Sequence, residues 1–268
     1  MPTTPIAKAF ISTVVVLLPF TAHAYFPFVT DDTGTQGKGG NQLEFAYEFV
    51  KEHANQLNED GRKIGTETGT ANVWFASYTR GLTDNLDIFF GAARQTTPVN
   101  GWQNSEIGLK WVFAGDQGKG WSAALKPGVI LPVSKSMQNS GLGNAETNWS
   151  LTLIGSYLHE DYEFHLNAGY TSNRYATTST SESQRTNLWT ISAAPVLVLN
   201  EQWKLGLDVG LTTNPGYNSR YQAFGGLGLV YAPVENLQIG LGAYATPAIN
   251  SKDNGWGYTI TTGLTFQF

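Results

Sequence analysis

From residue 42 to the end of the chain, apolar and polar side chains alternate one by one along most of the sequence. In residues 203–211, tryptophan, leucine and valine occupy every second position, while Lys204, Gly206, Asp208 and Gly210 lie between them. Successive side chains of a β-strand point to opposite sides, so a period of two predicts strands with one apolar and one polar face. We therefore expect an all-β protein.

Twelve segments carry this pattern. They are residues 42–51, 69–81, 84–95, 104–114, 120–132, 147–159, 161–172, 186–199, 202–213, 219–232, 236–247 and 256–268. In the second segment, Trp74 and Phe75 compete for the apolar face. The eighth contains Pro195, which cannot donate a hydrogen bond to a neighbouring strand, so we expect a bulge or an early strand end there.

The connections between these segments alternate in length. Every second one is a turn of at most five residues, whereas the intervening connections include long polar loops at residues 52–68, 133–146 and 173–185. An even number of strands, with short turns on one rim and long loops on the other, is typical of outer-membrane barrels. The pattern predicts a transmembrane antiparallel up-and-down β-barrel of about twelve strands, spanning residues 41–268 with both termini in the periplasm.

The distribution of charge indicates which face meets lipid, a question that alternation alone leaves open because soluble β-sandwiches also alternate. The cleaner apolar faces carry no charge away from the strand ends. A lysine or arginine at the bilayer midplane costs about 2–4 kcal/mol, which explains the exclusion. The charged side chains of the opposite face are our candidates for the lumen lining: Glu44, Glu48, Asp87, Glu106, Lys110, Lys126, Glu163, His165, Lys204 and Asp208.

Aromatic side chains gather near both ends of the strands on the apolar face, as the two interfaces of a membrane select. The last residue, Phe268, closes an alternating strand and resembles the terminal signal that the barrel-assembly machinery reads. Outer-membrane lipid and this machinery are therefore expected partners.

The first 24 residues have the features of a secretory signal peptide. Residues 9–20 form an apolar core, and Ala22-His23-Ala24 is a small-x-small cleavage site, so the mature chain would begin at Tyr25. The alternative, a membrane anchor, needs about 20 apolar residues. Export of a chain that spans a membrane with strands predicts localisation in the bacterial outer membrane.

Composition excludes several functions. Charged residues are 14% of the chain, and the net charge of −5 disfavours a nucleic-acid partner. The absence of cysteine excludes thiol catalysis and thiolate metal sites. The acidic pairs Asp31-Asp32 and Glu59-Asp60 lack the ligand spacing of a calcium loop, so no metal or cofactor is expected.

The number of strands indicates a narrow lumen, and the inward-facing residues indicate what lines it. Twelve strands lie between the filled eight-stranded barrels and the open porins of sixteen. Glycines on the inward parity, at positions 91, 108, 128, 206, 210, 240, 242 and 263, either keep a passage open or leave space for an inserted segment. Lys110, Lys126 and Lys204 are expected to neutralise Glu44, Glu106 and Asp208. Such pairs either stiffen the wall or form a polar track that orients a solute.

Residues 25–40 precede the first strand and carry a motif. Residues 30–44, TDDTGTQGKGGNQLE, resemble the opening signature of the outer-membrane transporter family associated with the meta-pathway of phenol degradation. The resemblance implies an outer-membrane barrel that takes up aromatic or other hydrophobic solutes. We hypothesise that the segment is a plug, with Asp31, Asp32, Gly34, Gln36 and Gly37 as its candidate residues. A plain periplasmic lead-in is the alternative.

The predicted function is passive diffusion of small, aromatic or hydrophobic solutes through the lumen, or lateral escape at an irregularity such as Pro195. A structural or adhesive barrel without transport is the main alternative. An outer-membrane lipid hydrolase fits less well, because it needs a serine–histidine pair near the rim. His165 is expected to point inward, away from lipid, and no Gly-x-Ser-x-Gly elbow occurs. We therefore expect no enzyme activity.

Overall fold

The computed structural model describes residues 25–57, 63–176, 184–216, 220–249 and 255–268. The expected signal peptide lies outside these residues. No helix in the described ranges has the length and apolar character that crossing a membrane requires.

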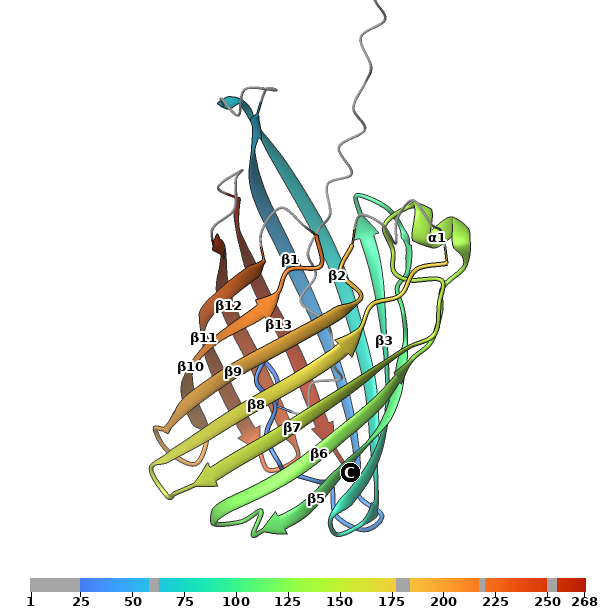
Figure 1. Ribbon diagram of the computed structural model, residues 1–268. Coiled ribbons are helices and arrows are strands. Elements are labelled where there is room, and N and C mark those ends of the chain that lie inside the picture. Colours follow the sequence, from blue (N-terminus) through green and yellow to red (C-terminus); the bar gives the residue numbers. More distant parts are fainter. Residues whose placement is uncertain (1–24, 58–62, 177–183, 217–219, 250–254) are drawn as a thin grey trace, which may run out of the picture.

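Twelve long strands, a two-residue strand and one short helix make up the described chain (Figure 1). In chain order they are β1 (Asn41–Leu57), β2 (Lys63–Thr83), β3 (Leu86–Thr97), β4 (Gly101–Trp102), β5 (Glu106–Gly115), β6 (Gly120–Ile130), α1 (Lys135–Asn139), β7 (Asn148–Leu158), β8 (Tyr162–Ser172), β9 (Asn187–Val198), β10 (Trp203–Thr213), β11 (Tyr221–Val234), β12 (Leu237–Ile249) and β13 (Trp256–Gln267).

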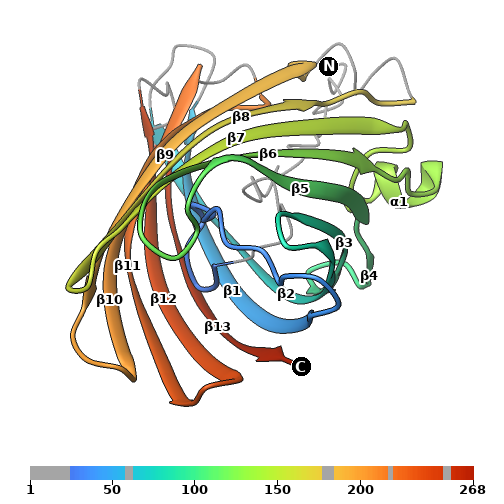
Figure 2. The same cartoon turned by 90° about the horizontal axis from the view of Figure 1, so that it is seen from below.

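The sheet closes on itself. Each long strand pairs antiparallel with its neighbours in the sequence, β1 pairs with both β2 and β13, and β2 pairs with β3. Viewed along its axis, the molecule is a ring of strands (Figure 2). Closure removes the unpaired strand edges that lipid cannot hydrate. The predicted twelve-stranded up-and-down barrel is confirmed, with β4 as a small addition beside β3.

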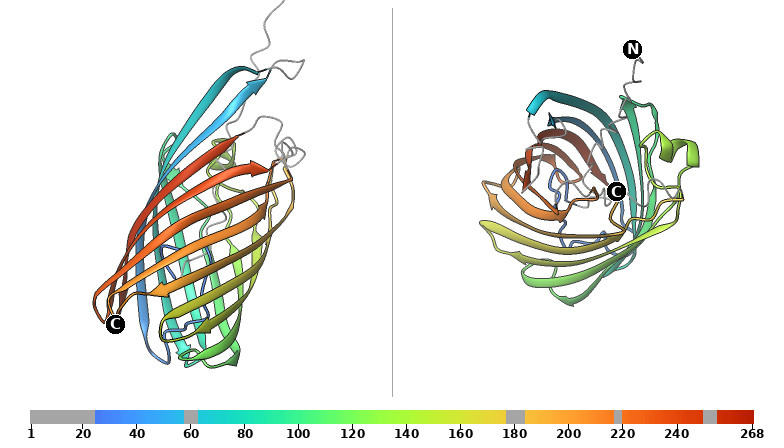
Figure 3. Two further views of the ribbon diagram at one scale, coloured as in Figure 1. Left: turned by 90° about the vertical axis from the view of Figure 1, so that its left-hand side faces the viewer. Right: turned by 45° about the horizontal axis from the view of Figure 1, so that its top comes forward.

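The predicted loop at residues 52–68 is largely strand. β1 and β2 stay paired beyond Lys51 and Thr70, out to Leu57 and Lys63, as a hairpin that rises above the rest of the barrel (Figure 3). Apart from Ala54, Leu57 and Ile64, the residues of this extension are polar or glycine, so the apolar periodicity that reveals the other strands is missing there. Alternating β-branched threonines still favour extended backbone. The other strand ends lie within two residues of prediction.

The bulge expected at Pro195 is also absent. β9 continues through this residue, which lies opposite Phe164 of β8. Pairing with β10 has the same register on both sides, since Val196 faces Gly206 and Ala193 faces Val209. The bulge is absent because the regular β8 ladder holds β9 straight, but the ladder with β10 skips Pro195 and Ala194, as expected at a residue that has no N–H.

Side-chain burial follows the predicted parity. Trp74 points outward and Phe75 packs inside against a cluster around Val73, which resolves the ambiguity in the second strand. Aromatic rings pair across strands near both ends of the barrel, with Trp121 and Tyr157 at one end and Trp149 and Tyr170 at the other. The wall thus presents an apolar band with aromatic borders outward and polar side chains inward.

Candidate functional site

Residues 25–40 run inside the barrel before joining β1, as the view along the axis shows (Figure 2). The segment has no strand or helix of its own. Its hydrogen bonds reach side chains on several parts of the wall, including Asp208 of β10 and Ser156 of β7. The lumen is therefore partly filled by the chain itself.

An aromatic anchor holds the start of this segment. Phe28 is 1% exposed and packs with Tyr25, Ala194 and Val196. It lies over Gly206, where an added Cβ atom would come within 2.5 Å of its ring. Gly228 and Gly240 make room in the same way for Phe28 and for the neighbouring Phe26. These glycines leave space for the inserted segment, which is one of the two interpretations that the sequence allows.

Polar contacts surround the Tyr25 ring. Its hydroxyl donates to Glu163, whose other oxygen lies 2.7 Å from Lys204 Nζ. The Tyr25 ring also contacts the His165 ring, at 4.8 Å between centroids. Burial, reinforced by the charge of Glu163, raises the pKa of the Tyr25 phenol well above its usual value, so the hydroxyl remains a donor.

Asp208 binds the backbone just after the anchor. Its carboxylate, which is fully buried, accepts hydrogen bonds from Val29 N at 2.6 Å, Thr30 N at 3.1 Å and Thr30 Oγ1 at 2.6 Å. Three donors at one carboxylate compensate for its loss of water. Asp208 therefore positions the inserted segment.

Asp31 and Asp32 meet two lysines of the wall. Lys126 Nζ lies 2.6 Å from Asp31, and Lys110 Nζ lies 3.3 Å from Asp31 and 3.0 Å from Asp32. The expected partners of Lys110, Lys126 and Lys204 were Glu44, Glu106 and Asp208, and the structure gives them others: Lys204 meets Glu163 of the wall, whereas Lys110 and Lys126 meet the inserted segment. The inserted segment brings its own carboxylates to Lys110 and Lys126, a contact that strand patterns alone do not reveal.

Thr33 of the inserted segment contacts two serine hydroxyl groups of the wall. Its backbone N–H donates to Ser156 Oγ at 3.1 Å, and its Oγ1 lies 2.6 Å from Ser122 Oγ. Ser156 Oγ is also 2.9 Å from His165 Nδ1. Thr33 therefore covers the serine–histidine pair from the lumen side.

The last part of the segment lies near the short-turn rim. Gln36 N donates to Asp87 at 3.1 Å, and Gly34 N donates to Asp32 at 3.0 Å. Gly37 adopts a positive φ of 69°, a conformation that glycine tolerates readily. Its carbonyl lies so near Gly81 that a Cβ atom at Gly81 would collide with it.

Three further candidate residues make no hydrogen bond or ion pair to the inserted segment among the described residues. Glu44 accepts a hydrogen bond from Ser77 at 2.7 Å, and Glu106 accepts one from Ser150. Glu48 lies on the same strand as Glu44, and its side chain has no hydrogen bond or ion pair within the described ranges. In those ranges, no three histidine, aspartate or glutamate side chains form a group that could hold a metal ion.

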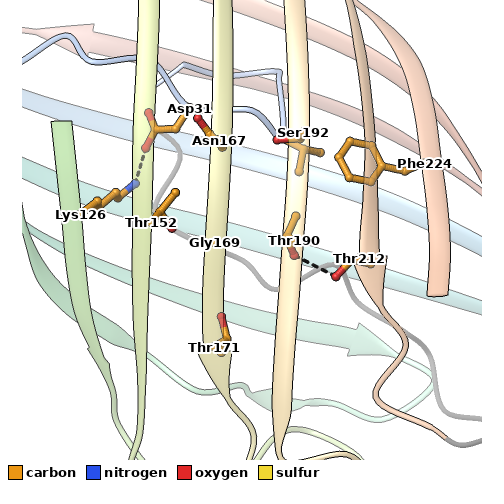
Figure 4. Close-up of a pocket in the computed structure, with 11 residues that line it drawn as sticks. Asp31, Lys126, Thr152, Asn167, Gly169, Thr171, Thr190, Ser192, Thr212 and Phe224 are labelled. Atoms are coloured by element: carbon orange, nitrogen blue, oxygen red, sulfur yellow. Dashed lines mark hydrogen bonds and ion pairs between the residues drawn. The ribbon is translucent and has the colours of Figure 1, made fainter. Parts of the chain in front are cut away.

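A pocket remains beside the inserted segment (Figure 4). It holds about 570 Å³ of space between atoms, part of it open to solvent, and lies against β6 to β11. Val29 and Asp31 of the segment form one side of it. Most of the wall side consists of hydroxyl-bearing residues: Thr152, Thr171, Thr190, Ser192 and Thr212.

Sequence reasoning missed several residues of this site. Phe28, Thr33 and Tyr244 were not candidates, although Tyr244 donates to Pro27 O at 2.8 Å and Phe28 is the main apolar anchor. The inward glycines at 206 and 240 were the available signal, because they mark where the wall admits bulky groups. No pattern identifies the partner of a non-repetitive segment.

The family described as "Putative MetA-pathway of phenol degradation" matches residues 22–262. The chain belongs to this family. The match includes the inserted segment and nearly all of the barrel, so the resemblance seen in residues 30–44 is confirmed over the length of the protein. No curated protein matches the chain.

Solved structures share the fold of this family member. The COG4313 outer membrane channel from Pseudomonas putida F1 is similar with a TM-score of 0.65 and 12% identity, over 88% of this chain and 98% of that one. The NanC porin is similar with a TM-score of 0.56 and 11% identity, over 82% and 98%. The KdgM porin in complex with disordered oligogalacturonate has a TM-score of 0.51 and 12% identity, over 85% and 99%. The fold is that of outer-membrane barrels.

Proposed function

We propose that this protein is a passive outer-membrane channel for small solutes, in which residues 25–40 form a plug that narrows the lumen. The supporting observation is a closed barrel whose polar interior holds the segment and still leaves a pocket beside it that is partly open to solvent. A protein that only needed a rigid wall would fill its interior with side chains, as small barrels do.

The proposed solutes are small and aromatic or otherwise hydrophobic. The family description names phenol degradation, and the similar solved barrels are named as channels or porins. A constricted lumen that makes contact with a solute suits small molecules better than polymers.

The proposal includes no covalent chemistry. Ser156 and His165 are in hydrogen-bond reach, but both are fully buried and Thr33 covers them. A lipid ester outside the barrel cannot approach Ser156. We also propose that outer-membrane lipid surrounds the apolar band and that the barrel-assembly machinery recognises the C-terminal strand. There the Phe268 side chain is exposed and its carbonyl accepts from Asn41 N at 2.9 Å.

Proteoliposomes test this function. Liposomes that contain the purified protein should admit arabinose and the aromatic cation benzyltrimethylammonium faster than protein-free liposomes. Deleting residues 25–35 should increase both fluxes if the segment is a plug. Unchanged fluxes after the deletion would contradict the plug, and no flux with either chain would favour a structural or adhesive barrel.

A further inference from the structure

The pocket beside the plug has a wall of hydroxyl groups. Thr190 Oγ1 and Thr212 Oγ1 lie 2.9 Å apart and bond to each other (Figure 4). The hydroxyls of Thr152, Thr171 and Ser192 have no hydrogen-bond partner among the described residues. Such groups on the rim of a cavity bind water or a solute, because a polar group without a partner is costly to bury.

The charges at the pocket compensate each other. Asp31 and Lys126 both line it, and they form the 2.6 Å ion pair (Figure 4). Both side chains are 3% exposed. A carboxylate-bearing solute would meet Asp31, and an ammonium-bearing solute would meet Lys126. The pocket therefore disfavours either charge and suits an uncharged solute.

The pocket also has a flat apolar part. The Phe224 ring is 3% exposed and lies over Gly210, where an added Cβ atom would come within 2.4 Å of the ring. Val29 of the plug adds an apolar group. An aromatic ring offers a face on which another ring packs. A ring with polar groups on its edge matches this combination of surfaces.

We propose that the pocket binds a small uncharged ring that carries hydroxyl groups, with the ring against Phe224 and the hydroxyls toward the threonines and Ser192. This inference rests on the proposed channel function and defines its solute more narrowly. A site built to bond hydroxyls discriminates strongly against analogues that lack them. The ring is either a hydroxylated benzene or a sugar, since both present this chemistry.

Glycine substitutions offer a matched pair of variants. Gly169 lines the pocket, and a Cβ atom there would meet only Thr152 Oγ1, at 3.5 Å, and two atoms of Thr190 farther away. Gly169→Val thus places bulk in the pocket without disturbing the wall. Gly155 of the adjacent strand β7 has nothing within 4 Å of its Cβ position. Its chain neighbours, Ile154 and Ser156, are fully buried on the inner face of β7, so Gly155 lies on the outer face and Gly155→Val adds the same bulk away from the lumen.

The experiment is calorimetric titration of the detergent-purified full chain with catechol, glucose, benzene and benzoate. Catechol or glucose should bind saturably, and whichever binds identifies the kind of ring. Benzene and benzoate should bind at least tenfold more weakly, because one lacks hydroxyls and the other is charged. Gly169→Val and the double variant Thr190→Val/Thr212→Val should each weaken the binding at least tenfold. Gly155→Val should bind as the unaltered chain does.

Three results would overturn the inference. They are equal affinity for benzene or benzoate, unchanged affinity in Gly169→Val, and no binding of catechol or glucose. Arabinose flux of the same preparations separates this failure from failure of the channel function. A preparation that conducts arabinose but binds neither ring refutes only the pocket.

Discussion

The Asp31 carboxylate lies 2.6 Å from the Lys126 ammonium, and each side chain is 3% exposed. One residue belongs to the irregular segment before the barrel, and the other lies on the inner face of β6. Two opposite charges removed from water stabilise each other only as a pair, and the loss of one leaves the other buried without compensation. The ion pair therefore makes the position of the segment depend on the wall.

Replacing Asp31 with asparagine should release the segment. Removing one partner of a buried ion pair costs about 3–5 kcal/mol. Lys126 would keep its charge without its 2.6 Å partner, and Lys110 would retain only Asp32. We expect a higher mean single-channel conductance in planar bilayers, because the undocked segment obstructs the lumen less.

Asp116→Asn is the matched control for that variant. Asp116 is exposed, and its Oδ1 accepts from Gly118 N at 2.8 Å, a bond that an asparagine can also accept. Its conductance should equal that of the unaltered chain. Equal conductance in Asp31→Asn would contradict the role of the ion pair.

Gly206 should tolerate alanine poorly as long as Phe28 is present. A Cβ atom at position 206 would lie 2.5 Å from the Phe28 ring, and overpacking of this kind costs about 1–3 kcal/mol. The free energy of unfolding in urea, measured in detergent, should fall by this amount in Gly206→Ala. Adding Phe28→Leu should recover part of the loss. Additive effects of the two substitutions would show that the residues do not interact.

The lumen should prefer cations. Of the charged side chains described for the segment and the inner wall, eight are carboxylates (Asp31, Asp32, Glu44, Glu48, Asp87, Glu106, Glu163 and Asp208) and four are lysines (Lys38, Lys110, Lys126 and Lys204). Excess negative charge in a narrow passage raises the local concentration of cations. Reversal potentials across a gradient of potassium chloride should report a cation-to-anion permeability ratio above one.

Glu48→Gln should lower that permeability ratio. Glu48 has no ion-pair partner within the described ranges, so the substitution breaks no ion pair. A buried carboxyl without a partner holds its proton more firmly than one in water, so the recordings are made at alkaline pH, where Glu48 carries its charge. Glu235→Gln, on the exposed turn between β11 and β12, is the control and should leave the ratio closer to its original value. The recordings belong at about 0.1 M salt, where the Debye length is about 10 Å. An anion preference in the unaltered chain would refute the charge argument.

The destabilisation caused by a charge on the apolar band should depend on how deep in the membrane the charge lies. Leu153 is 49% exposed near the middle of β7, and Tyr162 is 42% exposed at the first residue of β8. Leu153→Lys should lower the free energy of unfolding from liposomes by about 2–4 kcal/mol, and Tyr162→Lys by about 0–1 kcal/mol. Equal losses at the two positions would indicate that lipid does not cover this face.

Most of the wall was accessible from the sequence because its rule is local. Alternation and the exclusion of charge from one face locate the strands, and short turns set their order. The prediction failed in the hairpin extension between Lys51 and Thr70, because the strands there have no continuous apolar face. It also failed at Pro195, where pairing with β8 overrides a local irregularity.

The lumen was accessible only in part. The inward parity of Lys110, Lys126 and Asp208 is a property of the strands, and the structure buries all three side chains. The contact partners of these three side chains could not be predicted from the sequence. They belong to residues 25–40, which follow no period, and the path of that segment is set by complementarity of shape and charge with the wall. The sequence therefore suggested which groups face inward, but it did not reveal that Asp31 meets Lys126 or that Asp208 binds Val29 and Thr30.

The amino-acid sequence by itself determined the barrel, because a strand that borders lipid must keep one apolar face and pair all of its backbone groups. Only the tertiary structure decided what occupies the interior. Contacts such as Phe28 over Gly206, and the pocket beside Asp31, join residues far apart in the chain, and they exist only once the ring of strands has closed.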